Sequence, residues 1–275
     1  MALITAQALH ADKARHIFDC RFDLRDPCVG AKAYAEGHIP GAQYLHLHHD
    51  LSGETNGSNG RHPLPDPQNF ATRLGSLGLT PDTPVAIYDD AGGMFAARVW
   101  WMLRWIGHRG HVAVLDGGIQ AWQTAGYPVS QQPQSFPAQT YPLIKAGPVV
   151  RAQDVLSFLG SASAYLLDAR SGDRFRGEGE TLDPVGGHIP GARNRFFRDN
   201  LADDGHFKSA DQLRTEFMAQ LAGADPTTVV HSCGSGITAC HNLLAMEVAG
   251  LTGSRLYAGS WSEWSSDPSR PVEKG

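Results

Sequence analysis

Short apolar runs alternate along the chain with longer segments in which apolar residues recur at helical spacing. The clearest apolar runs, each of a length typical of a buried strand, are residues 112–115, 164–167 and 228–230. The clearest segments with helical spacing are residues 96–106, 212–221 and 238–249. This alternation, with glycine-rich turns after the strands, predicts an α/β fold of parallel sheets flanked by helices. In such sheets, functional sites lie at the carboxyl ends of the strands.

The sequence also repeats itself. Four segments return in the same order in the second half: residues 18–21 at 167–170, 37–42 at 187–192, 86–93 at 229–236 and 116–122 at 258–264. Four matches in one order indicate two copies of one unit. We therefore predict domains at residues 1–129 and 148–275. The linker between them, residues 130–147, is rich in Pro and Gln and has no apolar periodicity.

The first copy contains an insertion. The offset between the copies falls from 150 at the repeated Gly-His-Ile-Pro-Gly segment to 143 at the glycine-rich turn, so the first copy is longer between these two points. A polar stretch punctuated by glycine, residues 52–60, is where we expect a surface loop. This loop leads into Arg61 and His62, so His62 lies on an excursion that the second copy lacks.

Composition and charge exclude several classes of function. Of the 275 residues, 41% are hydrophobic and 19% are charged, which is typical of a folded globular protein. A net charge of −5 without runs of like charge gives no signal for nucleic acid or anionic lipid. The four cysteines have neither disulfide-scaffold nor zinc-site spacing, and no secretory signal or membrane-spanning run is recognisable. We expect a cytoplasmic enzyme without metal or other cofactor, and without nucleic-acid or membrane partners.

Cys233 stands where an apolar run ends in a glycine-rich turn, directly before a predicted helix. Gly234 and Gly236 allow backbone N–H groups to face inward, and the positive end of the helix adds to the same field. Converging N–H groups stabilise a thiolate, so we predict that Cys233 is a nucleophile in a cradle that prefers anions. The first copy has Asp90 at the matching position, so the fold does not require cysteine there for packing.

The repeat separates structural from functional residues elsewhere. Cys240 falls on an apolar helical stripe, and its counterpart is an alanine, so we predict a core residue. His38 and His188 occur in both copies, including the copy without a nucleophile, and Arg170 has a twin in Arg21. We predict structural roles for all four.

Other classes of cysteine chemistry fit less well. A loop of the phosphatase or arsenate reductase type requires an arginine six residues after the nucleophile, and that position is Ala239. A cysteine protease requires a positioned histidine and an orienting amide, and the sequence indicates neither. A compact cradle without such an arginine holds one additional anionic atom on the sulfur, which favours a persulfide.

The tandem Gly-His-Ile-Pro-Gly segments, the Cys-Gly-Ser-Gly-Ile-Thr-Ala-Cys segment at residues 233–240 and the Gly-Ser-Trp-Ser-Glu-Trp segment at residues 259–264 together resemble the two-domain rhodanese sulfurtransferases. The resemblance covers nearly the whole chain. The turn is most similar to the 3-mercaptopyruvate branch, which has Cys-Gly-Ser/Thr-Gly, whereas the thiosulfate branch typically has Cys-Arg-Lys-Gly. The resemblance implies two tandem rhodanese-like domains, of which the second is catalytic.

It further implies a ping-pong reaction. Cys233 takes a sulfane sulfur from 3-mercaptopyruvate or thiosulfate and passes it, from a persulfide, to a thiol such as a thioredoxin-like reductant, or to cyanide. The N–H groups of the turn residues Gly234, Gly236, Ile237 and Thr238 would hold the developing charge. A non-enzymatic alternative is a persulfide carrier or regulatory sulfur-relay module for a protein partner.

Site residues follow from the same resemblance. Arg174 aligns with the arginine that anchors the anionic group of the donor, and Ser235 and His62 resemble the residues that relay protons in the mercaptopyruvate branch, with Asp50 as a third member. That branch usually has a second carboxylate-binding arginine shortly after the first, but residues 177–185 contain none. Arg193 and Arg195 are the candidates to replace it, and thiosulfate stays open as a donor.

Overall fold

The computed structural model describes residues 2–12, 14–144, 146–161 and 164–275 of the chain, which form two compact units. The first unit consists of Met1–Gly53, Leu64–Pro148 and Asp203–His206, and the second of Glu54–Pro63, Val149–Ala202 and Phe207–Gly275. The excursion predicted from the repeat therefore packs with the second unit, although it belongs to the first half of the sequence. His62 is thereby brought into the same unit as Cys233.

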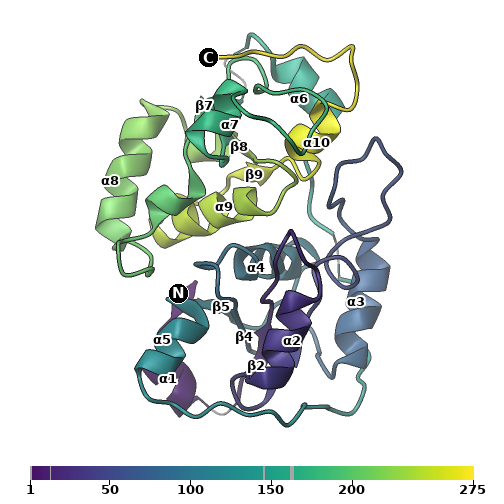
Figure 1. Cartoon of the computed structure of the whole chain (residues 1–275), viewed down its shortest axis with the longest axis vertical. Helices are drawn as coiled ribbons and strands as arrows, with labels where there is room; N and C mark the ends of the chain where they lie inside the picture. The colour runs from purple at the N-terminus through teal and green to yellow at the C-terminus, as the bar shows by residue number, and fades with distance from the viewer. Residues whose placement is uncertain (1, 13, 145, 162–163) are drawn as a thin grey trace. The chain divides into compact units, whose positions relative to one another are not determined.

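The first unit is built on a five-stranded parallel sheet with the order β1-β5-β4-β2-β3 (Figure 1). Its strands are β1 (Leu3–Ile4), β2 (His16–Asp19), β3 (Ala42–Tyr44), β4 (Val85–Tyr88) and β5 (Val112–Leu115). Its helices are α1 (Ala6–Ala11), α2 (Val29–Glu36), α3 (Pro67–Ser76), α4 (Ala96–Trp105) and α5 (Gly118–Thr124). Parallel strands require crossover connections, and these helices supply them.

The second unit has a four-stranded parallel sheet with the order β7-β6-β8-β9. Its strands are β6 (Tyr165–Asp168), β7 (Arg193–Asn194), β8 (Val229–Ser232) and β9 (Arg255–Leu256). Its helices are α6 (Ala152–Phe158), α7 (Gly172–Arg176), η1 (Phe197–Asn200), α8 (Ala210–Leu221), η2 (Pro226–Thr228), α9 (Thr238–Val248) and α10 (Ser260–Trp264). The order matches β3-β2-β4-β5 of the first unit, so the repeated sequence forms a repeated topology.

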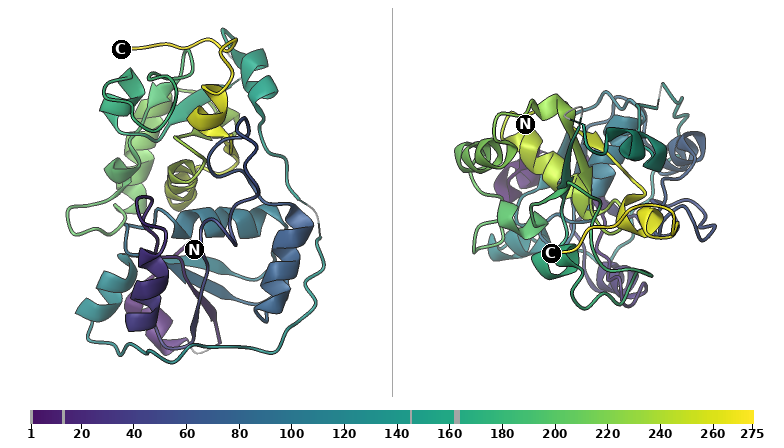
Figure 2. Two further views of the ribbon diagram at one scale, coloured as in Figure 1. Left: turned by 45° about the vertical axis from the view of Figure 1, so that its right-hand side comes forward. Right: turned by 90° about the horizontal axis from the view of Figure 1, so that it is seen from above.

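The predicted elements agree with the observed ones to within two residues at each end. The predicted strands are β5, β6 and β8, and the predicted helices are α4, α8 and α9. The expected α/β fold is confirmed. The segment after α5 has neither helix nor strand among its described residues up to 148, and it passes outside α3, where the N–H of Gln139 donates to the carbonyl of Gly75 at 2.8 Å (Figure 2).

Capping residues explain where two of the helices begin. Asp66 Oδ1 accepts hydrogen bonds from the N–H groups of Gln68 and Asn69, both at 2.9 Å, at the start of α3. Pro67 occupies the first position of that helix, where a missing N–H costs nothing. At the start of α8, Ser209 and Gln212 form a reciprocal capping box.

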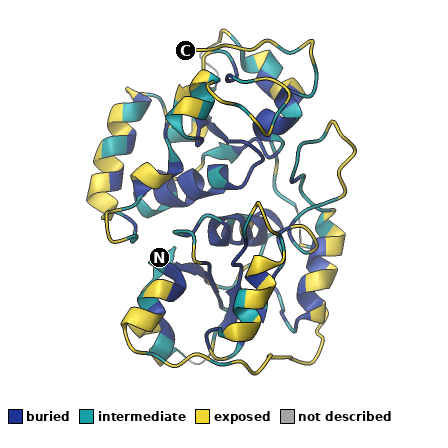
Figure 3. Cartoon of the chain, viewed as in Figure 1, coloured by how far each residue is buried: buried dark blue, intermediate teal, exposed yellow. Residues whose placement is uncertain are grey.

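The two helices that follow the glycine-rich turns are buried along most of their length. Figure 3 shows α4 and α9 largely buried, whereas α8 has a continuous exposed face. The strands that precede these turns, β4 and β8, are buried at every residue. Each turn is therefore fixed at both ends by an element of the core, so its backbone N–H groups are held in place.

The repeated charged pair has the same geometry in both units. Arg21 Nη2 donates to Asp19 Oδ2 at 2.6 Å and to the carbonyl of Gly37 at 2.7 Å. In the second unit, Arg170 Nη2 donates to Asp168 Oδ2 at 2.7 Å and to the carbonyl of Gly187, also at 2.7 Å. This pairing ties a strand end to the Gly-His-Ile-Pro-Gly segment and supports the structural role predicted for the arginine.

The repeated histidines are also equivalent. His38 stacks on Tyr34 with ring centroids 4.0 Å apart, and its Nδ1 lies 2.8 Å from the Tyr34 carbonyl. His188 stacks on Phe175 at 3.7 Å, and its Nδ1 lies 2.8 Å from the Phe175 carbonyl. Each ring contacts the carbonyl of a residue in the last turn of a helix, α2 for His38 and α7 for His188, which supports a structural role.

Candidate functional site

Cys233 directly follows β8 and opens the turn into α9. Its Sγ accepts a hydrogen bond from the N–H of Gly236 at 3.1 Å, and the side chain is 2% exposed. An N–H that points at sulfur stabilises negative charge that develops on it. Gly234 and Ile237 lie in the same turn and Thr238 begins α9, and in the described part of the chain none of the three has an N–H contact to Sγ.

The glycines of the turn are required by close approaches. Gly236 has φ +78°, and a Cβ there would lie 2.3 Å from the carbonyl oxygen of Ala258. A Cβ on Gly234 would lie 2.9 Å from Nη2 of Arg61. Larger residues would therefore push the turn away from the backbone on one side and from a guanidinium on the other.

Ser260 supports the cysteine from the start of α10, and the sequence analysis missed it. It adopts the left-handed conformation, φ 54°, which costs a residue with a Cβ about 1–2 kcal/mol. Its Oγ accepts the N–H of Cys233 at 3.0 Å and donates to the carbonyl of Tyr257 at 2.9 Å. The counterpart in the first unit is Gly118, φ 59°, so the repeat itself marks this serine as unusual.

His62 and Ser235 are in hydrogen-bond contact, with 2.8 Å between Nδ1 and Oγ. Both side chains are buried. The segment Glu54–Pro63 belongs to the second unit and brings His62 to the turn that contains Cys233. Its partner Ser235 follows the cysteine by two residues in the sequence. A serine hydroxyl paired with an imidazole can pass a proton in either direction.

Asp50 lies in the first unit. Its Oδ2 accepts the N–H of His46 at 2.7 Å, and its Oδ1 accepts Nε of Arg73 at 2.7 Å. The carboxylate is thus held by two donors of its own unit.

Arg174 lies on α7 beside the cysteine turn. Its Nη1 is 3.4 Å from the position that a Cβ on Gly234 would take. On its other side, Nη2 donates to Glu180 at 3.0 Å and to Asp183 at 3.2 Å. The predicted donor-binding arginine therefore adjoins the residue that follows Cys233.

Arg61 is a second arginine at the same place, and it was not predicted. Its Nη1 forms an ion pair with Asp183, and its Nη2 faces Gly234. The available signal was its position directly before His62 on the inserted loop. Whether its long side chain reaches the turn depends on how that loop folds, which local sequence does not reveal.

Arg193 and Arg195 are engaged elsewhere. Arg195 is buried and donates to Glu216 at 2.6 Å and to Asn200 at 3.0 Å. Arg193 is exposed and lies over the ring of Tyr165 at 5.0 Å. Neither is among the neighbours of Gly234, so the contacts at the turn come from Arg61 and Arg174.

The turn of the first unit is filled by its own aspartate. The ends of β4 and β8 place Asp89 at the position of Cys233, one residue before the predicted Asp90. The carboxylate of Asp89 accepts four N–H groups of the turn at 2.8–2.9 Å. Burial raises the pKa of Asp89, and these four donors oppose that effect. In the first unit, the N–H groups that could bind an anion are therefore already bound to the carboxylate of Asp89.

Two further side chains near the cysteine have packing roles. Cys240 is fully buried and its Sγ donates to the carbonyl of Gly236 at 3.3 Å, which supports the predicted core position. His231, on β8, has no hydrogen-bond partner for either ring nitrogen among the described residues. Burial lowers its pKa to about 3, so the ring is neutral and exchanges no proton near neutral pH.

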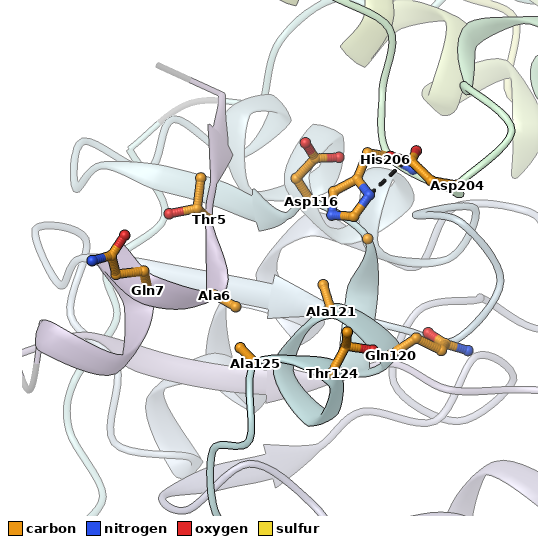
Figure 4. A pocket seen from close by; sticks show the side chains of 11 residues that line it. Thr5, Ala6, Gln7, Asp116, Gln120, Ala121, Thr124, Ala125, Asp204 and His206 are labelled. Atoms are coloured by element: carbon orange, nitrogen blue, oxygen red, sulfur yellow. Dashed lines mark hydrogen bonds and ion pairs between the residues drawn. The ribbon is translucent and has the colours of Figure 1, made fainter.

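The described part of the chain contains no cluster of three or more His, Cys, Asp or Glu residues that could hold a metal ion, and none of its helices is long and apolar enough to cross a membrane. A cavity of about 480 Å³ lies in the first unit, where Thr5, Asp116, Gln120 and His206 are among the lining residues (Figure 4). None of the predicted site residues lines it.

Comparison with known proteins gives consistent matches. The rhodanese-like domain family matches residues 4–125 and 151–267. A Pseudomonas aeruginosa relative named "Probable 3-mercaptopyruvate sulfurtransferase" is 48% identical over 282 residues, with 99% of this chain and 98% of the relative covered. Thiosulfate sulfurtransferase of Bos taurus is 36% identical, with 85% and 79% covered. The solved structure of 3-mercaptopyruvate sulfurtransferase from Leishmania major matches with a TM-score of 0.85 at 32% identity, covering 96% of this chain and 74% of that chain.

Proposed function

The chain belongs to the rhodanese-like domain family, and we propose that it is a sulfurtransferase that acts through a persulfide on Cys233. The donor is 3-mercaptopyruvate or thiosulfate, and the acceptor is cyanide or a thiol, including that of a thioredoxin-like reductant in the cytoplasm. The observation that carries the proposal is the N–H of Gly236 on the buried Sγ at 3.1 Å, in a turn flanked by two guanidiniums.

The first half-reaction transfers one sulfur atom. With 3-mercaptopyruvate, the Cys233 thiolate attacks the donor sulfur, an S–S bond forms, and the C–S bond breaks with its electron pair left on carbon. The proton of the donor thiol ends on that carbon, so the products are the enzyme persulfide anion and pyruvate. With thiosulfate, the S–S bond of the donor breaks and sulfite leaves with the electron pair, without any proton transfer. The N–H of Gly236 stabilises the charge on sulfur.

The second half-reaction restores the thiolate. Cyanide attacks the outer sulfur of the persulfide, the S–S bond breaks, and thiocyanate leaves while Cys233 keeps the electron pair. A thiol acceptor takes the sulfur in the same way and becomes a persulfide itself. Atoms and charges balance over the cycle without an external oxidant.

The pair formed by His62 and Ser235 suits the donor that requires a proton transfer. The carbon that loses sulfur becomes an enolate carbon, and its protonation gives pyruvate; the contact of 2.8 Å between His62 and Ser235 supports a route for that proton. On the family resemblance alone, we also propose Asp50 as the third member of this relay. Sulfite needs no such step, so the relay favours 3-mercaptopyruvate as the donor.

The proposed activity is tested by measuring kcat/KM for 3-mercaptopyruvate and for thiosulfate on one preparation, with cyanide as the acceptor. We expect the value for 3-mercaptopyruvate to be higher, by about tenfold or more, because a relayed proton accelerates a step by roughly 10²–10⁴. A higher value for thiosulfate would assign the chain to the other branch. Turnover no greater than that of Cys233→Ser with either donor would favour the non-enzymatic persulfide carrier.

The role of the relay is tested by Ser235→Ala and His62→Gln. Each variant should lower kcat for 3-mercaptopyruvate by roughly a hundredfold, whereas sulfur transfer from thiosulfate should stay within about twofold of the native value. Thiosulfate is the internal control, because it uses the same Cys233 and the same cradle. An equal loss with both donors would show that the two residues support the turn and do not transfer protons.

A further inference from the structure

We propose that Arg61 and Arg174 together bind the carboxylate of the sulfur donor, and that Asp183 holds their two guanidiniums in place and limits the affinity for that carboxylate. This inference rests on the proposed function and names the anion-binding residues of the same site. It assigns Arg61, on the inserted loop, the position that residues 177–185 leave without an arginine.

The two guanidiniums meet beside the residue that follows Cys233. Built on Gly234, a Cβ would lie 2.9 Å from Arg61 Nη2 and 3.4 Å from Arg174 Nη1. They are therefore the side-chain groups closest to this point of the turn. A donor whose sulfur lies on Cys233 has its carboxylate two carbons away, within reach of groups that line the next residue.

The nitrogens that face the turn have unused donors. Arg61 Nη1 is bound to Asp183, and Arg174 Nη2 is bound to Asp183 and Glu180. Arg61 Nη2 and Arg174 Nη1 donate to no residue in the described part of the chain. The two side chains are 31% and 25% exposed, so an anion can reach them from solvent. A guanidinium N–H forms a charge-assisted hydrogen bond with a carboxylate, which is stronger than a bond between neutral groups, and here each arginine offers one such nitrogen.

Asp183 connects the two arginines through a single carboxylate. Its Oδ1 pairs with Arg61 and its Oδ2 with Arg174, and its side chain is 2% exposed. Burial raises its pKa, while the two arginines oppose that rise. A buried carboxylate between two guanidiniums fixes their orientation, and its negative charge also repels an incoming anion.

Glu180 anchors the other edge of the arrangement. Its carboxylate accepts the N–H groups of Leu182 at 2.8 Å and Asp183 at 3.2 Å, in addition to Arg174. Burial alone would raise its pKa, but these N–H groups and the guanidinium hold the pKa below the ordinary value. Glu180 thus stays charged and keeps Arg174 at the turn when the donor binds.

The decisive comparison is between Asp183→Asn and the double variant Arg61→Met/Asp183→Asn. The shared change removes the buried carboxylate that Arg61→Met alone would leave with Arg174 as its one remaining arginine partner. The readout is the Kd for pyruvate, a 2-oxo carboxylate without sulfur, measured by calorimetry. We expect the double variant to bind about ten- to a hundredfold more weakly than Asp183→Asn, the range of a charge-assisted hydrogen bond. Equal affinities would overturn the role of Arg61.

Asp183→Asn should bind pyruvate about three- to tenfold more tightly than the native chain, because the negative charge between the two guanidiniums, which repels an incoming anion, is removed. Weaker or unchanged binding would contradict the limiting role of Asp183. Arg176→Ala serves as the control, since Arg176 is exposed and pairs with Glu178. The Kd for pyruvate does not depend on sulfur transfer, so it tests the role of the arginines alone. A separate assay of sulfur transfer by the native chain tests the proposed function, and the two failures can therefore be told apart.

Discussion

Replacing Cys233 by serine should abolish sulfur transfer from both donors and leave the fold intact. The side chain is buried at 2% exposure, and a hydroxyl fits in its place and can accept the N–H of Gly236. Serine cannot form a persulfide, so no intermediate accumulates and the rate falls to that of the uncatalysed reaction. The measurement is thiocyanate production with each donor, alongside thermal unfolding to confirm that the variant is folded. Residual turnover above background would place the nucleophile elsewhere.

A related control adds a cysteine to the other copy of the fold, one residue after Asp89, which is the counterpart of Cys233. Asp90→Cys in the Cys233→Ser chain should restore no activity, because the carboxylate of Asp89 already takes the four N–H groups of that turn at 2.8–2.9 Å. A cysteine there therefore lacks both the donors that stabilise a thiolate and the paired arginines. Restored transfer would show that a cysteine in this turn becomes a nucleophile even when the carboxylate of Asp89 occupies the N–H groups.

Replacing Arg174 by alanine should raise the KM for 3-mercaptopyruvate by roughly ten- to a hundredfold, because the proposed charge-assisted contact to the donor carboxylate would be lost. Alkylation of Cys233 by a neutral reagent should proceed at nearly the native rate, since the N–H of Gly236 is untouched. Glu180 keeps the N–H groups of Leu182 and Asp183, so its buried charge retains partners.

Arg176→Ala is the control for this variant, because Arg176 lies on the same helix, α7, but pairs with Glu178 at 2.8 Å, and both side chains are exposed. Its KM should equal that of the native chain. A KM that stays unchanged in Arg174→Ala as well would contradict the assignment of the carboxylate-binding residues.

Much of the fold could be predicted because its signals are local or repeated. The strand and helix periods mark β5, β6, β8, α4, α8 and α9, and the repeated segments show that one topology occurs twice. Strands such as β7 and β9 contain two residues each, and pairing with a neighbouring strand defines them. No pattern within so short a segment can indicate this.

The predicted equivalence of Asp90 and Cys233 is wrong by one residue, because it rests on a constant sequence offset between the two copies. The turn between β4 and α4 spans residues 89–95, whereas the turn between β8 and α9 spans residues 233–237. A constant offset cannot hold across turns of unequal length. The strand registers, which the sequence does not contain, identify Asp89 as the counterpart.

The residues of the candidate site also fall into two groups, those with a local sequence signal and those defined by tertiary contacts. Cys233 was predicted from the turn in which it lies, and Arg174 from the resemblance of a continuous segment. Arg61 and Ser260 contact the turn from segments far away in the sequence, and their roles depend on tertiary neighbours. The repeat contained one usable signal, a serine where the first copy has glycine at a left-handed position.

The central claim is that one sulfur atom is carried covalently on Cys233, and mass spectrometry of the intact chain and of its peptides tests it most directly. After treatment with 3-mercaptopyruvate or thiosulfate without an acceptor, the peptide that contains Cys233 should gain the mass of one sulfur atom, and cyanide should remove it. A persistently unchanged mass with both donors, or a gain located on Cys20, Cys28 or Cys240, would contradict the account.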